Sequence, residues 1–187
     1  FMGMVLQACA ISVTSDSKDA IVPSKNYITQ KVKVEHFEGI STSSSIDVKY
    51  TQTNGSTEVE GGMLKIFFYS EETGKGINIK GKHNTEVRIS APAVHALRAS
   101  SSGDILLMNG LQYDGDVSIN SSSSGDIKGG NILCKALETD ASSSGDIELE
   151  NVECTTLVTE ASSAGDISID YVKAETVSVE ASSSGDV

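Results

Sequence analysis

The stretch Ala99-Ser100-Ser101-Ser102-Gly103-Asp104-Ile105 decides the fold of this 187-residue chain. Close copies follow it to the end of the chain, and their glycines fall at positions 103, 125, 145, 165 and 185. The spacings between these glycines are 22, 20, 20 and 20 residues. A fixed period of this length is typical of an array in which each structural repeat packs on its neighbours.

Aligning the copies shows which positions of the repeat are apolar. The apolar columns are Ile127/Ile147/Ile167, Ile132/Val152/Val172, Cys134/Cys154/Ala174 and Leu137/Leu157/Val177. Apolar and polar residues alternate over short stretches, which is the pattern of a β-strand with one buried face. No stretch shows the apolar stripe of a helix.

A 20-residue unit with two or three such strands buries its apolar face only by stacking on copies of itself, about 4.8 Å apart. The sequence therefore predicts an all-β fold, a β-solenoid. We expect a single-stranded, right-handed β-helix with coils of about 20 residues, preceded by less regular β coils. A leucine-rich repeat has a similar period, but its consensus is absent.

Composition and charge exclude several classes of function. The chain has 17 Gly, no Trp and 5% aromatic residues, which suits a narrow solenoid interior. Residues 99–187 hold three Lys, no Arg and sixteen Asp and Glu, a net charge of −13. This acidity argues against nucleic acid, which needs a basic surface, and against electrostatic binding to membranes.

The part of the chain before the repeats differs from them. Alternation predicts strands at 46–50, 57–60, 63–69, 77–80 and 86–90. Asn54-Gly55 is typical of a two-residue hairpin turn. We therefore expect an irregular N-terminal β region at 31–98, which passes near Pro92 into the regular solenoid at 99–187. The last repeat stops midway at Val187, so we expect the protein to continue beyond it.

The start of the chain contains a candidate lipid-attachment site. Leu6-Gln7-Ala8-Cys9 looks like a bacterial lipobox, which makes residues 1–9 the remnant of a signal peptide, Cys9 the acylated residue and 10–30 a polar tether. This predicts an outer-membrane lipoprotein of the cell envelope, surface-exposed or periplasmic, that touches the membrane only through its lipid. The alternatives are a cloning remnant and an ordinary buried strand.

The aspartates that follow the glycines are the main candidate site. Asp104, Asp126, Asp146 and Asp166 should stack along one corner, where like charges repel unless solvent screens them or a cation binds. Turn chemistry is the simpler interpretation: Gly supplies a positive φ and Asp accepts a backbone N–H. Calcium is the alternative. No metal site and no cofactor are predicted. The adjoining serines fit a tight corner, or could present hydroxyls to a sugar.

Other residue types point to no catalysis. His36, His83 and His95 lie outside the array at unrelated spacings, and no metal, triad or phosphate-binding pattern appears. Cys134 and Cys154 share a column on adjacent coils, but in-register parallel neighbours rarely meet the torsion of a disulfide, so we expect free thiols. The sequence predicts a protein that is not an enzyme.

Several stretches resemble the bacterial family called putative auto-transporter adhesin, head GIN domain. These are 37–40, 46–52, 62–66, the eponymous tripeptide Gly76-Ile77-Asn78, and 91–94 leading into 97–104. The resemblance covers about residues 31–187. One departure is that only Glu60-Gly61-Gly62 separates Val59 from Met63, where such proteins carry a longer segment, so the first coil is expected to be incomplete.

The resemblance implies a β-helical fold, a role in adhesion and no catalytic residues. Such proteins are typically lipoproteins or secreted proteins of Bacteroidetes-like bacteria. We therefore expect a lipid-anchored adhesin whose repeated polar surface binds an unidentified surface ligand, a glycan or a protein, with a second copy of the chain as a further partner. A periplasmic structural protein is the alternative. A carbohydrate-active β-helix would need a catalytic cluster beyond Val187.

Overall fold

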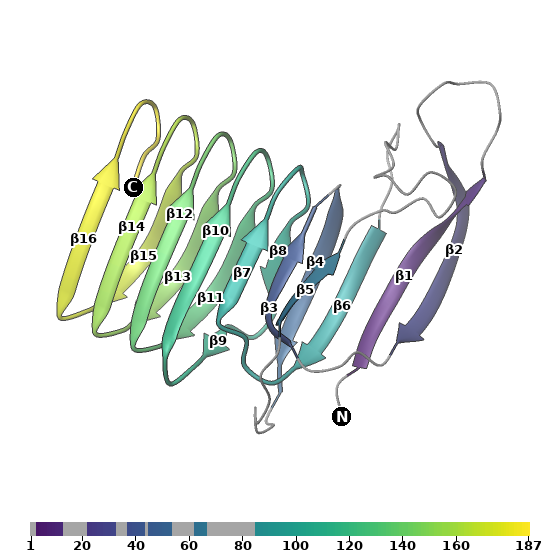
Figure 1. Ribbon diagram of the computed structural model, residues 1–187, viewed down its shortest axis with the longest axis horizontal. Coiled ribbons are helices and arrows are strands. Elements are labelled where there is room, and N and C mark those ends of the chain that lie inside the picture. The colour runs from purple at the N-terminus through teal and green to yellow at the C-terminus, as the bar shows by residue number, and fades with distance from the viewer. Residues whose placement is uncertain (1–2, 13–21, 33–36, 44, 54–61, 67–84) are drawn as a thin grey trace.

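The computed structural model describes residues 3–12, 22–32, 37–43, 45–53, 62–66 and 85–187 (Figure 1). Every regular element in these ranges is a β-strand, and none is a helix. The strands form two sheets that run side by side along the length of the molecule. The predicted all-β solenoid is therefore confirmed, whereas the handedness of its coil stays a prediction.

Each regular repeat forms one coil of two strands, one in each sheet. Strands of successive coils pair in parallel and in register, so that Ile127 pairs with Ile147 and Ile147 with Ile167. Sheet I contains β11 (Ile127–Leu133), β13 (Ile147–Glu153) and β15 (Ile167–Lys173). Sheet II contains β10 (Asp116–Ser121), β12 (Ala136–Ala141), β14 (Thr156–Ala161) and β16 (Thr176–Ala181).

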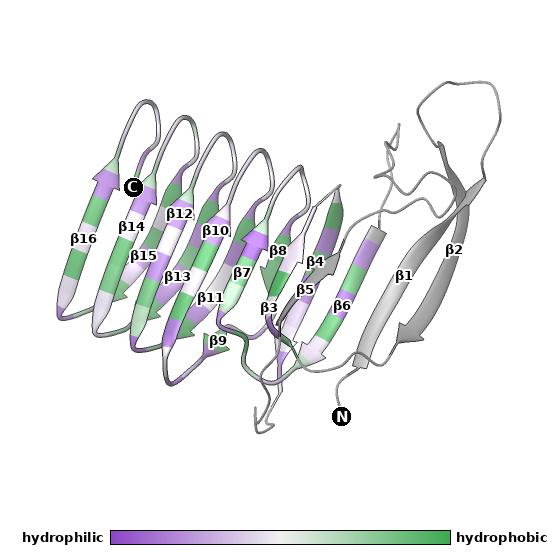
Figure 2. Cartoon of the chain, viewed as in Figure 1, coloured by the Kyte–Doolittle hydropathy of each residue, from purple (hydrophilic) through white to green (hydrophobic). Residues whose placement is uncertain are grey.

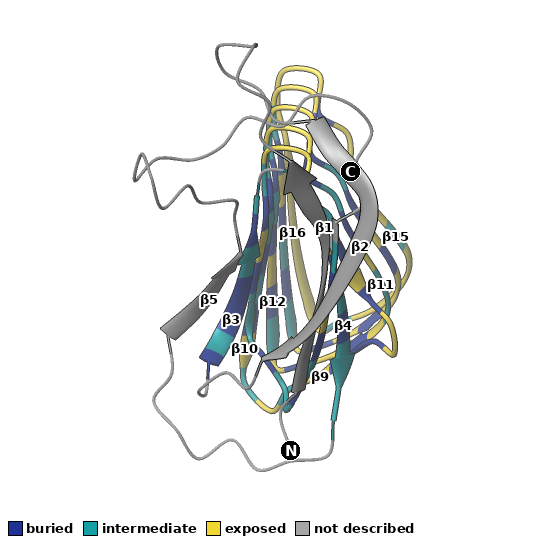
Figure 3. Cartoon of the chain, turned by 90° about the vertical axis from the view of Figure 1, so that its right-hand side faces the viewer, coloured by how far each residue is buried: buried dark blue, intermediate teal, exposed yellow. Residues whose placement is uncertain are grey.

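The core lies between the two sheets. The apolar columns of the repeat point inward, and Ile127, Ile147, Leu137 and Leu157 are all buried. Figure 2 shows the alternation of apolar and polar residues along each strand, and Figure 3 shows the buried residues between the sheets and the exposed turns at one end. The column pattern in the sequence is thus the packing pattern of the solenoid.

The coils that precede β10 follow the same plan. Sheet I continues with β4 (Ile46–Gln52), β6 (Thr85–Ala91), β8 (Ile105–Leu107) and the short β9 (Leu111–Gln112). Sheet II continues with β3 (Phe37–Thr42), β5 (Gly62–Ile66) and β7 (Ala96–Ala99). The predicted strands at 46–50 and 86–90 correspond to β4 and β6, and the predicted strand at 63–69 corresponds to β5 as far as residue 66, beyond which it lies outside the described residues. The predicted turn at Asn54-Gly55 and the strands at 57–60 and 77–80 lie outside the described residues.

The order of these early coils differs from their order in the chain. In sheet I, β4 lies between β8 and β6, and in sheet II, β3 lies between β7 and β5. The first coil of the chain, β3–β4, is therefore internal to the stack. Both edges of β4 are paired, in parallel, with β6 and β8.

Residues 92–95 carry the chain from β6 to β7 past the β3–β4 coil. The hydroxyl of Tyr50, which is fully buried in β4, donates a hydrogen bond to the carbonyl oxygen of Pro92 at 2.7 Å. Burial raises the pKa of this phenol. The amide of His95 donates to the carbonyl oxygen of Glu38 at 2.8 Å. These bonds fix the crossing segment to the coil that it passes.

A hairpin pairs with the outer edge of β6. It consists of β1 (Gly3–Ser12) and β2 (Val22–Val32), which pair antiparallel, and β1 also pairs antiparallel with β6. The sequence predicts a tether at 10–30, but the structure places much of this stretch in strands. An unpaired sheet edge offers a row of backbone donors and acceptors, and pairing with them outweighs a polar local composition.

Candidate functional site

The corner that joins sheet II to sheet I is a tight turn in each repeat from residue 99 onward. In the coil of β10 and β11, the amide of Gly125 donates to the carbonyl oxygen of Ser122 at 3.1 Å, and Ser123 has a φ of 63°. The equivalent serines at 143, 163 and 183 have φ between 61° and 64°. The residue with positive φ is thus a serine, and the expectation that Gly supplies it is wrong.

The corner glycine is needed for space instead. A Cβ atom at Gly125 would lie 2.6 Å from the amide nitrogen of Ser100 and 2.7 Å from the carbonyl oxygen of Gly103, in the preceding coil. Gly145, Gly165 and Gly185 meet similar close contacts. The repeat therefore keeps glycine because backbone packs directly against backbone at this corner.

The aspartates form the predicted ladder. Each one accepts a hydrogen bond, through one carboxylate oxygen, from the backbone amide of the aspartate in the next coil. The distances are 2.9 Å from Asp126 N to Asp104 Oδ1, 3.1 Å from Asp146 N to Asp126 Oδ1 and 3.0 Å from Asp166 N to Asp146 Oδ1. The aspartates therefore accept hydrogen bonds from the next coil, whereas the prediction had them accept a bond within their own turn.

The ladder carries an electrostatic cost. Desolvation by burial raises the pKa of Asp126, and the charges of Asp104 and Asp146 raise it further, while the hydrogen bond from the Asp146 amide lowers it. In the described part of the chain, no three His, Cys, Asp or Glu side chains are grouped so that they could hold a metal ion. The hydrogen bonds from the backbone amides account for the ladder, and calcium stays an alternative without a described cluster to support it.

The corner serines bond across coils through their backbone. The amide of Ser144 donates to the carbonyl oxygen of Ser123 at 3.0 Å, and the amide of Ser184 donates to Ser163 at 2.7 Å. Ser123, Ser143 and Ser163 are exposed, so the corner presents a row of small polar side chains to solvent.

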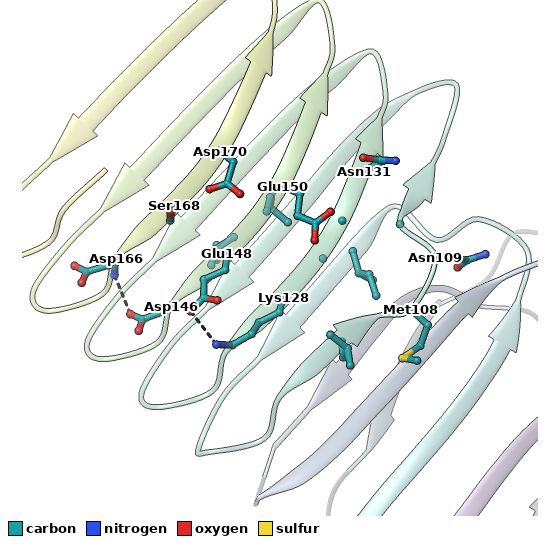
Figure 4. Close-up of a pocket in the computed structure, with 17 residues that line it drawn as sticks. Met108, Asn109, Lys128, Asn131, Asp146, Glu148, Glu150, Asp166, Ser168 and Asp170 are labelled. Carbon is teal, nitrogen blue, oxygen red and sulfur yellow. Dashed lines mark hydrogen bonds and ion pairs between the residues drawn. The ribbon is translucent and has the colours of Figure 1, made fainter.

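The outer face of sheet I holds a hollow of about 860 Å³ that sequence reasoning missed (Figure 4). Two outward-facing columns line it. One column contains the paired residues Leu106, Lys128, Glu148 and Ser168. The other contains the residues two positions further along the chain, Met108, Gly130, Glu150 and Asp170. The sequence contained one sign of it, the Gly129-Gly130 pair inside an otherwise regular strand.

The structure describes the side chains of two of the cysteines, Cys134 and Cys154, and of one of the histidines, His95. Cys134 and Cys154 are free and buried, as expected. Burial raises the pKa of Cys134 to about 12 and raises that of Cys154 too, so neither thiol ionises readily. His95 lies 3.4 Å from Glu38 and stacks on Tyr113. His36, His83 and the Gly76-Ile77-Asn78 tripeptide lie outside the described residues.

Cys9, the predicted acylation site, lies on β1, where its backbone is opposite Tyr27 of β2. Residues 3–7 of the same strand pair with β6. Within the described ranges, no helix is long and apolar enough to cross a membrane.

Comparisons with known proteins agree with this architecture. The structure is similar to a putative adhesin from Bacteroides fragilis, with a TM-score of 0.64, 19% identity, and coverage of 89% of this chain and 98% of that one. It is also similar to a putative lipid binding protein from Parabacteroides distasonis, with a TM-score of 0.53, 19% identity, and coverage of 90% and 99%. At these identities the likeness concerns the fold alone. A comparison with curated protein sequences finds no match.

Residues 49–187 match the family described as putative auto-transporter adhesin, head GIN domain, which is more than half of the chain. The match includes the whole repeat array together with β6, β7 and most of β4. This 187-residue β-solenoid therefore belongs to the family of putative auto-transporter adhesins with a head GIN domain.

Proposed function

We propose that this protein is a non-catalytic, lipid-anchored protein of the cell envelope that presents the outer faces of its solenoid to a ligand. The observation that carries the proposal is the exact register of the coils, which repeats the same outward-facing positions every 20 residues. Weak contacts repeated along a rigid body add up to useful avidity. Family membership supports a role in adhesion and a location in the envelope or at the cell surface.

Other features support a binding role over a catalytic one. In the described part of the chain, the repeat spreads the acidic side chains, and no three His, Cys, Asp or Glu side chains are grouped so that they could hold a metal ion. The thiols of Cys134 and Cys154 are buried with raised pKa values, which disfavours a nucleophilic role for these two residues. A rigid surface that repeats the same positions is suited to recognition.

The lipid anchor adds a consequence for the N-terminus. Cleavage before Cys9 would remove residues 3–7, which pair with β6. A chain cleaved and anchored at Cys9 would therefore lack the pairing of residues 3–7 with β6. The outer edge of β6 would then be open to another partner.

The first experiment is protease shaving of intact cells that carry the protein, with a periplasmic protein as the control for leakage. Cleavage while the control survives supports presentation at the surface. Protection until the envelope is broken would overturn adhesion to external surfaces and favour the periplasmic structural role.

The anchor is tested separately by membrane fractionation of a Cys9→Ser variant. Release of the variant into the soluble fraction, with the parent retained on membranes, is the expected result. Retention of both forms would contradict acylation at Cys9. A Cys154→Ser variant is the matched control, because its cysteine is buried in the solenoid.

A further inference from the structure

The hollow on sheet I changes in character along the solenoid. At its β8 end the outward residues Leu106 and Met108 are apolar, with exposed fractions of 38% and 53%. In the next coil they are Lys128 and Gly130, and in the two coils after that they are acidic or polar. The face therefore has an apolar end and an acidic end.

Gly130 makes the depression between these ends. A Cβ atom there would lie 3.4 Å from Glu150 Oε2 and meet nothing else but the Glu150 carboxyl carbon at 3.9 Å. The backbone at Gly130 does not require glycine through a positive φ or a close approach to backbone. The missing side chain thus leaves open space beside a carboxylate, at a position where neighbouring coils carry Met108 and Glu150.

The charges around the depression are not balanced. Lys128 is bound to Glu148, with Nζ to Oε1 at 2.8 Å, and this ion pair raises the pKa of the lysine. Glu150 and Asp170 form no ion pair with any residue that the structure describes, although both line the hollow. Figure 4 shows these carboxylates on successive coils, with Met108 at the other end.

We propose that this hollow binds a cationic amphipathic peptide segment, with an apolar side chain against Leu106 and Met108 and Lys or Arg side chains at Glu150 and Asp170. Charge complementarity selects the cationic end, and the two exposed apolar side chains select the other. Three coil steps separate Met108 from Asp170, about 14 Å. An extended segment of about five residues spans that distance. The inference rests on the proposed binding role and gives it a ligand class.

Binding is measured with purified protein and a fluorescent synthetic peptide of two leucines followed by three lysines. We expect saturable binding that weakens as salt rises, because salt screens exposed charges. The same peptide with glutamates in place of the lysines should not bind, and neither should a version with serines in place of the leucines. Absence of binding by the lysine peptide, or equal binding by all three, overturns the proposal.

Variants locate the site. The pair Glu150→Gln and Asp170→Asn should weaken binding about five-fold, from the energies of exposed ion pairs. Gly130→Leu places a side chain in the hollow at a position where a Cβ atom meets no backbone, and should abolish binding while the melting temperature is retained. The matched control is Asp140→Asn with Glu160→Gln, which removes the same charge from sheet II and should leave binding unchanged.

Loss of binding in the control pair, unchanged binding in Gly130→Leu, or competition by a neutral oligosaccharide would each overturn the peptide site. Because purified protein is used, these results are independent of where the protein lies in the envelope. A failure here and a failure in protease shaving are therefore distinguishable.

Discussion

At the residue scale, the corner glycine shows what a repeat can and cannot reveal. Its recurrence predicts a tight corner, and the structure has one. The reason for the glycine could not be predicted, because it depends on the distance to backbone in another coil. The positive φ falls on the serine two positions earlier, for which serine is an uncommon choice.

The glycine contact predicts that Gly165→Ala lowers the free energy of unfolding by about 1–3 kcal/mol, the range for overpacked sites. Its new Cβ would lie 2.7 Å from Ser142 N and 2.8 Å from Ala141 C. Gly130→Ala is the matched control and should be neutral or up to about 1 kcal/mol more stable. Chemical denaturation measures both, and an equal effect of the two variants would contradict the steric explanation.

Two buried threonines offer a second prediction. The Oγ1 atoms of Thr139 and Thr159 are the buried side-chain polar atoms that lack a hydrogen-bond partner in the described part of the chain. Replacing each with valine should raise the free energy of unfolding by about 1 kcal/mol, because a buried hydroxyl without a partner is costly.

Thr42 is the control for this prediction. It is buried too, but its Oγ1 donates to the carbonyl oxygen of Ile46 at 2.6 Å. Thr42→Val should therefore lower the free energy of unfolding by about 1 kcal/mol. A loss of stability in all three valine variants would show that the unpartnered hydroxyls carry no penalty.

At the element scale, the aspartate ladder predicts a dependence on pH. Burial raises the folded-state pKa of Asp126, so the folded protein holds that proton more tightly than the unfolded chain does. The stabilisation is fully present below the unfolded pKa of about 4 and is lost as pH rises through the folded pKa. At neutral pH the charged Asp126 is therefore unfavourable to folding.

Asp126→Asn removes this charge and keeps an oxygen that accepts the Asp146 amide. We expect the variant to have a higher urea midpoint than the parent at about pH 7, with the difference shrinking towards about pH 3. Measuring the urea midpoint of both proteins across that pH range separates the effect of Asp126 from that of the other titrating groups. A difference that grows on acidification would contradict the raised pKa.

The early coils are the elements that the sequence predicts least well. Alternation located β4 and β6 within two residues at each end, because one face of each is buried. It could not predict that β4 is flanked by β6 and β8, since those partners lie elsewhere in the chain and share no repeat with it. Both edges of β4 are occupied by parallel partners from further along the chain.

At the scale of the whole molecule, periodicity predicted the solenoid because spacing and residue identity agree over five copies. The candidate site was predicted only in part. The ladder follows directly from in-register stacking, but the hollow at Gly130 depends on which outward side chain is missing, and no recurring pattern marks it. A uniform repeat thus predicts the solenoid, whereas the hollow lies where Gly130 departs from the repeat.

Stacking also concentrates negative charge, because acidic residues of adjacent coils lie about 4.8 Å apart, as in the pair Asp140 and Glu160. We expect the melting temperature to rise between about 0.01 M and 0.5 M NaCl, as the screening length falls from about 30 Å to below 8 Å. Asp140→Asn with Glu160→Gln should melt higher at low salt and gain less from added salt. A melting temperature that falls with salt would show that ion pairs such as Lys128–Glu148 dominate instead.

The internal position of the β3–β4 coil bears on how such a protein can change length during evolution. Between β11 and β13 the chain crosses from one coil to the next in sequence, so duplication of one 20-residue unit there adds a coil and preserves every existing interface. The same insertion between β4 and β8 would move β6 and β7 one coil further apart. Residues 92–95 join those two strands over a fixed distance, with Tyr50 bound to Pro92. Relatives of different length should therefore vary in the number of regular coils and keep the three-coil junction of β3 to β8 constant.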